Sequence, residues 1–344
     1  MTGHLLVDSP GLFTTLQDLG RFGQQNLGVP VSGALDAIAL RIANALVGNR
    51  EALAGLEIRG AGPTMRVETD SVRIALAGTT AALEILGEAA RVVPGWHSVR
   101  LARGDVFRIG PLRDTATCYC AVEGGFAVPA LFDSQSTYVR GRLGGFDGRA
   151  LRAGDRLPLG QPEAPDRSEV RLNGSPPYGT GDAVRVVLGP QQGHFTEAGI
   201  KTFLESSFII SNQADRMGLR LDGPVLEHAA GHDIVSDGIA TGSIQVPGTG
   251  LPIILLADHQ TTGGYPKIAT VASVDLPRLG RMRPGETLRF QAVTVEEAEA
   301  ARRAQENEIL RLIDGFAPVR EDLRLDSETL LSANLISGVV SSDE

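Results

Sequence analysis

The chain has 344 residues, a formal net charge of −9 and 42% hydrophobic residues, which predicts about two domains with substantial cores. The acidic balance and the lack of a basic cluster argue against nucleic acid as a partner. No apolar stretch approaches the roughly 20 residues that a membrane helix needs, and residues 1–11 lack the basic start of a signal peptide. We therefore expect a soluble cytoplasmic protein that binds neither nucleic acid nor membrane.

We expect mainly short strands in the first 160 residues of the chain. A strand at 4–7 leads into a polar, glycine-rich segment that carries Gln17, Asp18 and Arg21. Apolar residues at helical spacing then predict a helix over 32–44, with Ser32 or Asp36 as its N-terminal cap. Further strands are expected at 54–59, 64–68, 72–77, 82–86, 99–101, 106–109 and 116–122. Their spacing favours an all-β sheet or barrel over alternating strands and helices.

Turn-rich sequence separates this region from a second half. Residues 124–159 contain several turns and a group of hydroxyl side chains from Ser134 to Tyr138. The next segment, 161–182, is rich in Pro, Gly and charge, and we interpret it as a domain linker. Beyond it we expect a strand at 184–188, a short helix at 195–203 and a strand at 207–210.

The C-terminal region has a clear helix signal. Thr294 and Glu297 have the spacing of a capping box, which predicts a charged helix that ends near Ile313. From Ser337 onward the pattern is lost, and we expect that part of the tail to be disordered.

The two halves of the chain resemble each other in three short matches. Residues 31–42 match 210–221, residues 56–63 match 244–251, and residues 282–288 match 151–157 or, in another register, 101–107. A tandem duplication would give two similar β-rich domains with a ligand cleft between them. The predicted boundaries are 1–160 for the first domain with inserted hairpins, 161–182 for the linker, 183–292 for the second domain, and 293–344 for the C-terminal helix and tail.

The strongest candidate site follows a short apolar strand, Pro252–Ala257, in the second half. A dense polar cluster from Asp258 to Lys267 comes directly after it. Tyr265 and Lys267 could polarise a carbonyl or take a proton, and Asp258 could orient them. The pairs Asp18/Arg21 and Asp215/Arg216 each place a carboxylate near a guanidinium. Such a pair is a structural ion pair or an arginine fork for a carboxylate or carbonyl ligand.

Several other chemistries are not supported by the sequence. There is no phosphate-binding loop, no Gly-x-Ser-x-Gly elbow and no Met-Lys-Met biotin acceptor. His228 and His232 are four residues apart, but glycine and proline surround them, so we expect a solvated loop and no metal site. Cys118 and Cys120 point to the same face of a strand, which indicates buried reduced thiols and no disulfide.

Taken together, the motifs resemble one known family. They include TTLQDLGRFGQQNLGVPVSGALD, STYVRGRLGGFDGRAL, SNQADRMGLRL, and SDGIATGSIQVPGTGLPIILLADHQTTGGYPKI, and they extend over about residues 10–290. This combination is similar to the allophanate hydrolase subunit 2 family. That family includes the C component of 5-oxoprolinase, the KipI-antagonist protein and part of the carboxyltransferase region of urea carboxylase. Two positions depart from its usual pattern: His259 replaces a common Arg, and Arg281 replaces a frequent Gln.

The resemblance implies a mainly β fold of two cyclophilin-like β-barrel domains, with few short helices and a C-terminal helix. It implies a heteromeric, ATP-dependent 5-oxoprolinase complex that opens the lactam of 5-oxoproline to glutamate. The expected partners are a protein of the subunit 1 family, like the B component of 5-oxoprolinase, and a LamB/YcsF-type A component. This chain would bind no cofactor alone, and the complex would use ATP.

In this interpretation Asp258, Tyr265 and Lys267 are catalytic. The predicted substrate-binding residues are Arg216, Gln245, Gln260, Thr261, Gly263 and Gly264. One alternative is a biotin-dependent carboxyltransferase component that acts on urea or a related amide. Another is a non-catalytic regulatory protein that binds a partner, like the KipI antagonist.

Overall fold

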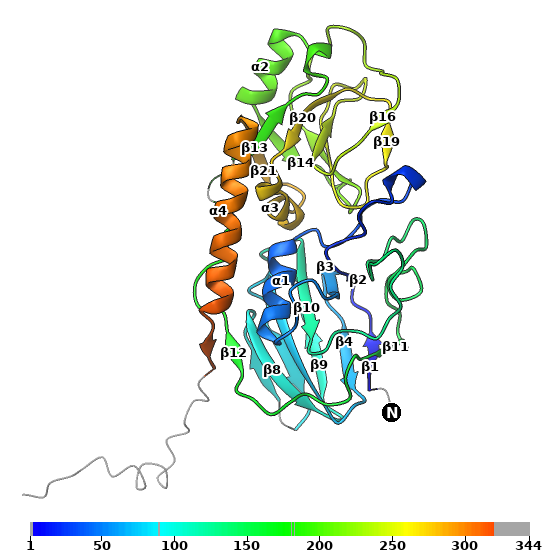
Figure 1. Cartoon of the computed structure of the whole chain (residues 1–344), viewed down its shortest axis with the longest axis vertical. Helices are drawn as coiled ribbons and strands as arrows, with labels where there is room; N and C mark the ends of the chain where they lie inside the picture. Colours follow the sequence, from blue (N-terminus) through cyan, green and yellow to red (C-terminus); the bar gives the residue numbers. More distant parts are fainter. Residues whose placement is uncertain (1–2, 89, 180, 182, 320–344) are drawn as a thin grey trace, which may run out of the picture.

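The computed structural model describes residues 3–319 except 89, 180 and 182. It has two lobes stacked end to end, with one long helix along the side of both (Figure 1). The first lobe contains the strands from β1 to β12, and the second contains those from β13 to β21. The chain is therefore mainly β.

The first lobe is built from two sheets that enclose one apolar core. The six-stranded sheet has the order β11 (Arg156–Pro158), β1 (His4–Ser9), β4 (Thr64–Val67), β9 (Val106–Ile109), β6 (Leu83–Leu86) and β7 (Arg91–Val93). The seven-stranded sheet has the order β2 (Phe13–Gln17), β3 (Gly55–Arg59), β10 (Thr117–Val122), β5 (Ser71–Ala77), β8 (His97–Ala102), β12 (Val170–Arg171) and β22 (Ala317–Pro318).

Strand β10 of the seven-stranded sheet is covered on both faces. All six of its residues are buried. Cys118 and Cys120 belong to the core between the sheets, whereas Tyr119 and Ala121 pack against α1 (Ala37–Leu46) on the other face. Successive side chains of a strand point to opposite faces, and every residue of β10 except Thr117 belongs to one of these two apolar clusters.

The second lobe is a closed barrel. Its strands have the order β13 (Ala183–Leu188), β20 (Lys267–Val271), β17 (Ser243–Gln245), β18 (Ile253–Leu255), β15 (Gly218–Asp222), β14 (Ser207–Ile210) and β21 (Thr287–Ala292). The remaining elements are a two-stranded sheet, β16 (Asp237–Gly238) with β19 (Thr262–Gly263), the helices α2 (Glu197–Glu205) and α3 (Leu276–Arg281), and the 3₁₀ turns η1 (Gln25–Leu27), η2 (Gln192–His194) and η3 (Ser273–Asp275).

Helix α4 (Val295–Asp314) connects the lobes on one side (Figure 1). Both hydrogen bonds of the predicted Thr294–Glu297 capping box are present at its start. The carboxamide of Gln305 donates to the carbonyl oxygens of Pro177 and Val274, at 2.9 Å each. Arg41 of α1 ion-pairs with Glu306 at 2.6 Å. The helix therefore contacts the first lobe, the second lobe and the segment between them.

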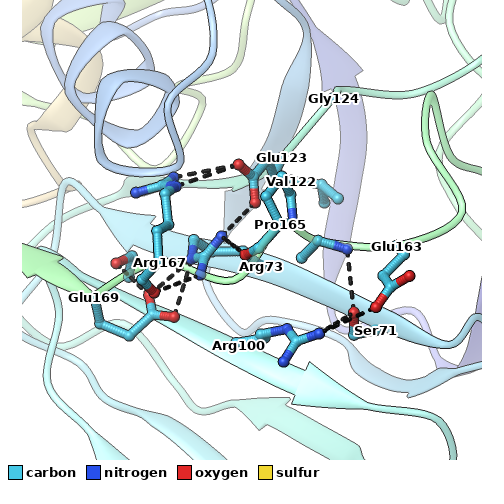
Figure 2. A network of polar contacts seen from close by, with 12 residues as sticks. Ser71, Arg73, Arg100, Val122, Glu123, Gly124, Glu163, Pro165, Arg167 and Glu169 are labelled. Atoms are coloured by element: carbon cyan, nitrogen blue, oxygen red, sulfur yellow. Dashed lines mark hydrogen bonds and ion pairs between the residues drawn. The ribbon is translucent and has the colours of Figure 1, made fainter.

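Figure 2 shows how the segment before the second lobe is attached to the first. The Arg73 side chain is fully buried and ion-pairs with Glu169 at 2.9 Å and Glu123 at 2.6 Å. It also donates to the carbonyl oxygens of Pro165 (3.1 Å) and Arg167 (3.0 Å). The first part of the predicted 161–182 linker thus packs on the first lobe, and β12 extends its sheet.

Most local predictions are confirmed, and one larger prediction needs revision. Strand 207–210 and the buried free cysteines are confirmed, and Asp36 caps α1 by accepting from the Ala39 amide. The first half, however, forms two sheets within the described residues, whereas a barrel was expected there. The matched stretches 31–42 and 210–221 also differ, because the first enters helix α1 and the second enters strand β15. The duplication and the domain boundaries stay predictions, and residues 320–344 lie outside the described part.

Candidate functional site

Polar side chains from both lobes meet where the lobes touch. Arg216 precedes β15 in the second lobe and is 4% exposed. Its guanidinium binds Asp258 through Nε at 2.8 Å and Glu57 of β3 in the first lobe through Nη1 at 2.5 Å. Nη2 donates to the Gly33 carbonyl at 2.7 Å. We call Asp18, Arg21, Glu57, Arg216 and Asp258 the junction cluster.

Arg216 is held in its charged form. Burial alone would lower the pKa of Arg216, but the carboxylates of Glu57 and Asp258 outweigh burial and raise it. Because each of its three nitrogens already donates to a protein oxygen, its main role is to join the two lobes. Its neighbour Asp215 pairs instead with Arg140, at an exposed contact of 3.0 Å.

The network continues from Glu57 into the first lobe. The second oxygen of Glu57 accepts from the Tyr119 hydroxyl at 2.6 Å and from the Leu35 amide at 3.0 Å. The Tyr119 hydroxyl in turn accepts from the Asp36 amide. The Asp36 carboxylate binds Arg281 of α3 at 3.2 Å, so a second charged pair crosses the junction. Burial raises the pKa of Asp36, although the nearby Arg281 opposes this shift.

Asp18 organises a distant loop of the first lobe. Its Oδ1 accepts from the hydroxyls of Ser134 (2.8 Å) and Ser136 (2.5 Å), and its Oδ2 accepts from the Gln135 amide at 2.6 Å. This loop is conformationally strained: of the six non-glycine residues with positive φ in the described chain, Phe132, Asp133, Arg142 and Asp147 lie in it. Strain of this kind often accompanies functional sites, because the surrounding contacts must hold it.

Arg21 is the member of the junction cluster that has free donors. Its side chain is 1% exposed, and Nη2 donates to the Ser136 carbonyl. Its Nε and Nη1 atoms have no hydrogen-bond partner among the described residues. Burial lowers the pKa of Arg21, while the charges of Asp18 and Asp258 oppose that shift. An unsatisfied buried guanidinium is costly, so these free donors suggest a site for an anionic or carbonyl oxygen.

A large cavity lies beside the junction cluster. It has a volume of about 680 Å³ and is lined mainly by apolar residues of the 19–38 segment and 256–257, while α4 contributes Arg302, Gln305, Glu306 and Ile309. Ser32 also lines it, and the Ser32 hydroxyl is buried with no partner among the described residues. Asp18, Arg21 and Asp258 do not line this cavity.

A second polar cluster lies inside the second lobe. Lys267 of β20 is 2% exposed and donates to Asp237 at 2.9 Å and to the Gly238 carbonyl at 3.3 Å. The Gln191 side chain accepts from the Lys267 amide at 3.1 Å. Nearby, the Gln260 amide group donates to Gln245 of β17 at 3.2 Å. We call Gln245 and Gln260 the glutamine pair.

The predicted site residues therefore divide between two places. Asp258 and Arg216 belong to the junction cluster, whereas Lys267 and the glutamine pair lie within the barrel lobe. Tyr265 is 41% exposed, and the Thr261 carbonyl accepts from the Ile239 amide. Gly263 belongs to β19, and Gly264 follows it.

Sequence reasoning left Arg21 undecided between an ion pair and a ligand fork, and it did not select Glu57 as a site residue. The junction cluster forms only through contacts between residues far apart in the chain. Asp18 and Ser134 are 116 positions apart, and Glu57 and Arg216 are 159 apart. The available signal was the proximity of Asp18 and Arg21 in a polar glycine-rich segment.

His259 has a structural role in this arrangement. It is 1% exposed, with Nδ1 2.6 Å from the Gln260 carbonyl and Nε2 3.1 Å from the Thr241 hydroxyl. Burial lowers the pKa of His259, which favours the neutral ring. Its Nδ1–H then donates to the carbonyl, and Nε2 accepts from Thr241. These two hydrogen bonds hold the backbone in place between Asp258 and Gln260.

In the described part of the chain, no helix is long and apolar enough to cross a membrane. No group of three or more His, Cys, Asp or Glu residues there is placed to hold a metal ion. His228 and His232, whose spacing was considered for zinc, do not belong to such a group; His228 Nε2 lies 3.1 Å from the Val246 carbonyl oxygen.

Comparison with known proteins identifies the family. The chain is 37% identical to the C component of 5-oxoprolinase from Escherichia coli over 296 residues, covering 86% of this chain and 93% of that protein. It is 35% identical to the C component of 5-oxoprolinase from Haemophilus influenzae over 303 residues, covering 87% and 96%.

Its fold is similar to that of the K. lactis urea amidolyase, with a TM-score of 0.80 and 26% identity. That match covers 94% of this chain but only 20% of the much longer urea amidolyase chain. The model of the family described as carboxyltransferase domain, subdomain A and B, matches residues 27–292. The chain belongs to this carboxyltransferase domain family, within which its relatives include components of 5-oxoprolinase and parts of urea amidolyase.

Proposed function

We propose that this chain is the C component of an ATP-dependent 5-oxoprolinase complex, which opens the lactam of 5-oxoproline to glutamate. The match to two relatives with this name, over nearly their whole length, supports the proposal. The substrate carries a carboxylate and a cyclic amide. A suitable site must therefore offer a cation for the first group and hydrogen-bonding groups for the second.

The observation that carries the proposal is the buried Arg21 guanidinium with its free Nε and Nη1 donors. We assign the substrate carboxylate to Arg21. Sequence reasoning had favoured Arg216 for this role, but each nitrogen of Arg216 already has a protein acceptor. Asp18 and Asp258 flank Arg21 closely enough to act on its charge, and they would hold it in place for the substrate.

The other components of the reaction would come from partner chains. The sequence has no phosphate-binding loop, so we propose that ATP is used by the complex and that this chain binds no cofactor alone. The proposed partners are a B-type component from the subunit 1 family and a LamB/YcsF-type A component. Within this chain Asp258, Tyr265 and Lys267 remain proposed catalytic residues. Lys267 would first have to release Asp237, which it contacts at 2.9 Å.

The test is an Arg21→Met variant in the reconstituted three-component complex. Loss of a charge-assisted hydrogen bond costs about 1.5–3 kcal/mol, so kcat/KM for 5-oxoproline should fall about 10- to 100-fold. The matched control is Arg103→Met, because Arg103 is an exposed first-lobe arginine paired with Asp70. Glutamate release, measured with and without ATP, is the readout. Unchanged kcat/KM in a folded Arg21→Met complex would refute the assignment.

A second candidate is a biotin-dependent carboxyltransferase component that acts on urea or a related amide. The family match and the similarity to urea amidolyase favour it. It predicts carboxyl transfer to urea when biotin carboxylase and a biotinylated carrier are added, and no ATP-dependent glutamate release without them. A purely regulatory, KipI antagonist-like protein would show neither activity with any partner set.

A further inference from the structure

The cavity beside the junction cluster opens to solvent and is formed by both lobes. It lies where α1, α3 and α4 come together (Figure 1). Phe22, which is 69% exposed, and the exposed Ala52 line it, as do the buried Leu35, Leu256 and Ile309. The cavity therefore extends from the surface into the protein. Its volume of about 680 Å³ is within the range of sites that bind small molecules.

The charged residues that line the cavity neutralise one another. Arg41 pairs with Glu51 at 2.5 Å and with Glu306 at 2.6 Å, and Arg302 pairs with Glu306 at 3.0 Å. The two arginines and two glutamates contribute no net charge to the lining. A charged ligand would find no free counterion among them, so the lining favours a neutral molecule.

The Ser32 hydroxyl differs from the neighbouring polar groups of the lining. It is buried and has no partner among the described residues, and Ser32 itself is 4% exposed. By contrast, the Thr241 hydroxyl lies 3.1 Å from His259 Nε2, and the Gln305 carboxamide donates to two carbonyl oxygens. An unsatisfied buried hydroxyl costs free energy, so it marks the point at which a ligand would gain a hydrogen bond.

The backbone at Ser32 is held in a strained conformation. Its φ is 55°, in the left-handed region that favours glycine, and Gly33 after it has a φ of 84°. Contacts across the junction hold this turn: the Ser32 amide donates to the Ala257 carbonyl at 2.9 Å, and the Gly33 carbonyl accepts from Arg216 at 2.7 Å. Glycine would adopt the φ of Ser32 at lower cost, so stability alone does not account for a serine here. Strain that surrounding contacts hold in place is typical of ligand sites.

We propose that the cavity is a second ligand site, separate from Arg21, for a neutral and mainly apolar molecule that carries a hydroxyl, such as an aryl alcohol. Its apolar body packs between α1, α4 and Leu276 of the second lobe, and its hydroxyl pairs with Ser32, which can donate or accept. Because the lining comes from both lobes and from α4, the bound molecule also holds the lobes in this arrangement. The site is independent of the proposed 5-oxoproline chemistry, since Asp18, Arg21 and Asp258 do not line the cavity.

The test is ligand-observed NMR titration of the purified chain with 2-naphthol and 2-methylnaphthalene. The two probes share their rings, but one carries a hydroxyl and the other a methyl group. Ser32→Gly removes the hydroxyl and should weaken 2-naphthol binding about 10-fold while 2-methylnaphthalene binding stays unchanged. Since glycine favours this φ, the variant should unfold at or above the wild-type temperature. Ser273→Gly is the matched control, because Ser273 lines the same cavity but is exposed, and it should bind both probes as the wild type does.

A second pair of variants tests where the probes bind. Ala37→Phe puts a phenyl group into the cavity from α1 and should lower the affinity for both probes at least about 10-fold. Ala304→Phe is its control, because Ala304 is exposed on α4 and does not line the cavity, and it should leave both affinities unchanged. If Ala37→Phe does not fold, Ala52→Phe at the exposed rim gives the same test.

The inference is overturned if Ser32→Gly binds 2-naphthol as tightly as the wild type, or if the phenylalanine variants that line the cavity keep full affinity for both probes. Tighter binding of the anion 2-naphthoate than of 2-naphthol would also overturn it, because a free counterion would then face the cavity. Failure of the proposed function is a separate result: the reconstituted complex would not hydrolyse 5-oxoproline, while 2-naphthol binding to this chain alone would persist.

Discussion

The contacts of the junction cluster predict how much unfolding free energy each of three variants should lose, in a definite order. Arg216 lies between two buried carboxylates, with Nη1 2.5 Å from Glu57 and Nε 2.8 Å from Asp258. Replacing Arg216 with Met leaves both carboxylates facing each other without their cation. Removing one partner of a buried ion pair typically costs about 3–5 kcal/mol, and here two acceptors are stranded at once. We therefore expect the Arg216→Met variant to lose at least about 4 kcal/mol of unfolding free energy.

Glu57→Gln should be much milder. It removes one of the two carboxylates, so Arg216 and Asp258 remain as a neutral pair. The new carboxamide oxygen can still accept from Tyr119 and the Leu35 amide, but its NH2 group then faces Arg216 Nη1, so the charged hydrogen bond to Arg216 is lost. We expect a loss of about 1.5–3 kcal/mol, the contribution of one charged hydrogen bond. Arg140→Met is the control, because Arg140 and Asp215 also join the lobes but are more than half exposed. Exposed pairs contribute at most about 1 kcal/mol.

The assay is equilibrium unfolding in urea, followed by far-ultraviolet circular dichroism. The deficit of Arg216→Met should shrink as the pH falls from about 8 to about 5, because a bound proton can relieve the repulsion between the stranded carboxylates. The reasoning is refuted if Arg216→Met is no less stable than Glu57→Gln, or if its deficit does not depend on pH.

Two further predictions concern buried titratable groups. Burial raises the pKa of Asp36 above its ordinary value of 3.8, so its protonated form favours the folded state. The free energy of unfolding of the wild type, relative to that of Asp36→Asn, should therefore be greatest below about pH 4 and decrease as the pH rises through the raised pKa of Asp36. Urea unfolding at a series of pH values measures this difference. A difference that grows with pH would contradict the prediction. Burial also raises the pKa of Cys120 to about 12, and Cys118 is equally buried. Neither thiol should react with Ellman's reagent at pH 8 until the protein unfolds; rapid labelling of the native chain would show that this strand is accessible.

Local sequence was sufficient for the elements whose signals are short in range. The capping box at Thr294, the cap at Asp36 and strand 207–210 depend on neighbours within a few residues, and each is present. The alternating burial of Cys118 and Tyr119 also follows from strand geometry alone. These features need no knowledge of the tertiary fold, because hydrogen bonds and side-chain directions within an element decide them.

The contacts of the candidate site required the tertiary structure. Sequence proximity suggested that Asp215 pairs with Arg216, yet Arg216 turns into the lobe junction and binds Glu57 from the other lobe. It also grouped Asp258 with Lys267, which instead lies on β20 of the barrel and pairs with Asp237 of β16. The packing of the lobes decides which carboxylate lies next to a buried cation. Burying a charge without a partner is costly, so each buried charge pairs with an opposite charge that the packing brings within reach. The same packing leaves Arg21 and the glutamine pair with hydrogen-bonding atoms that have no partner among the described residues. Local sequence singled out these residues, but only the tertiary contacts decide which of their atoms are unpaired.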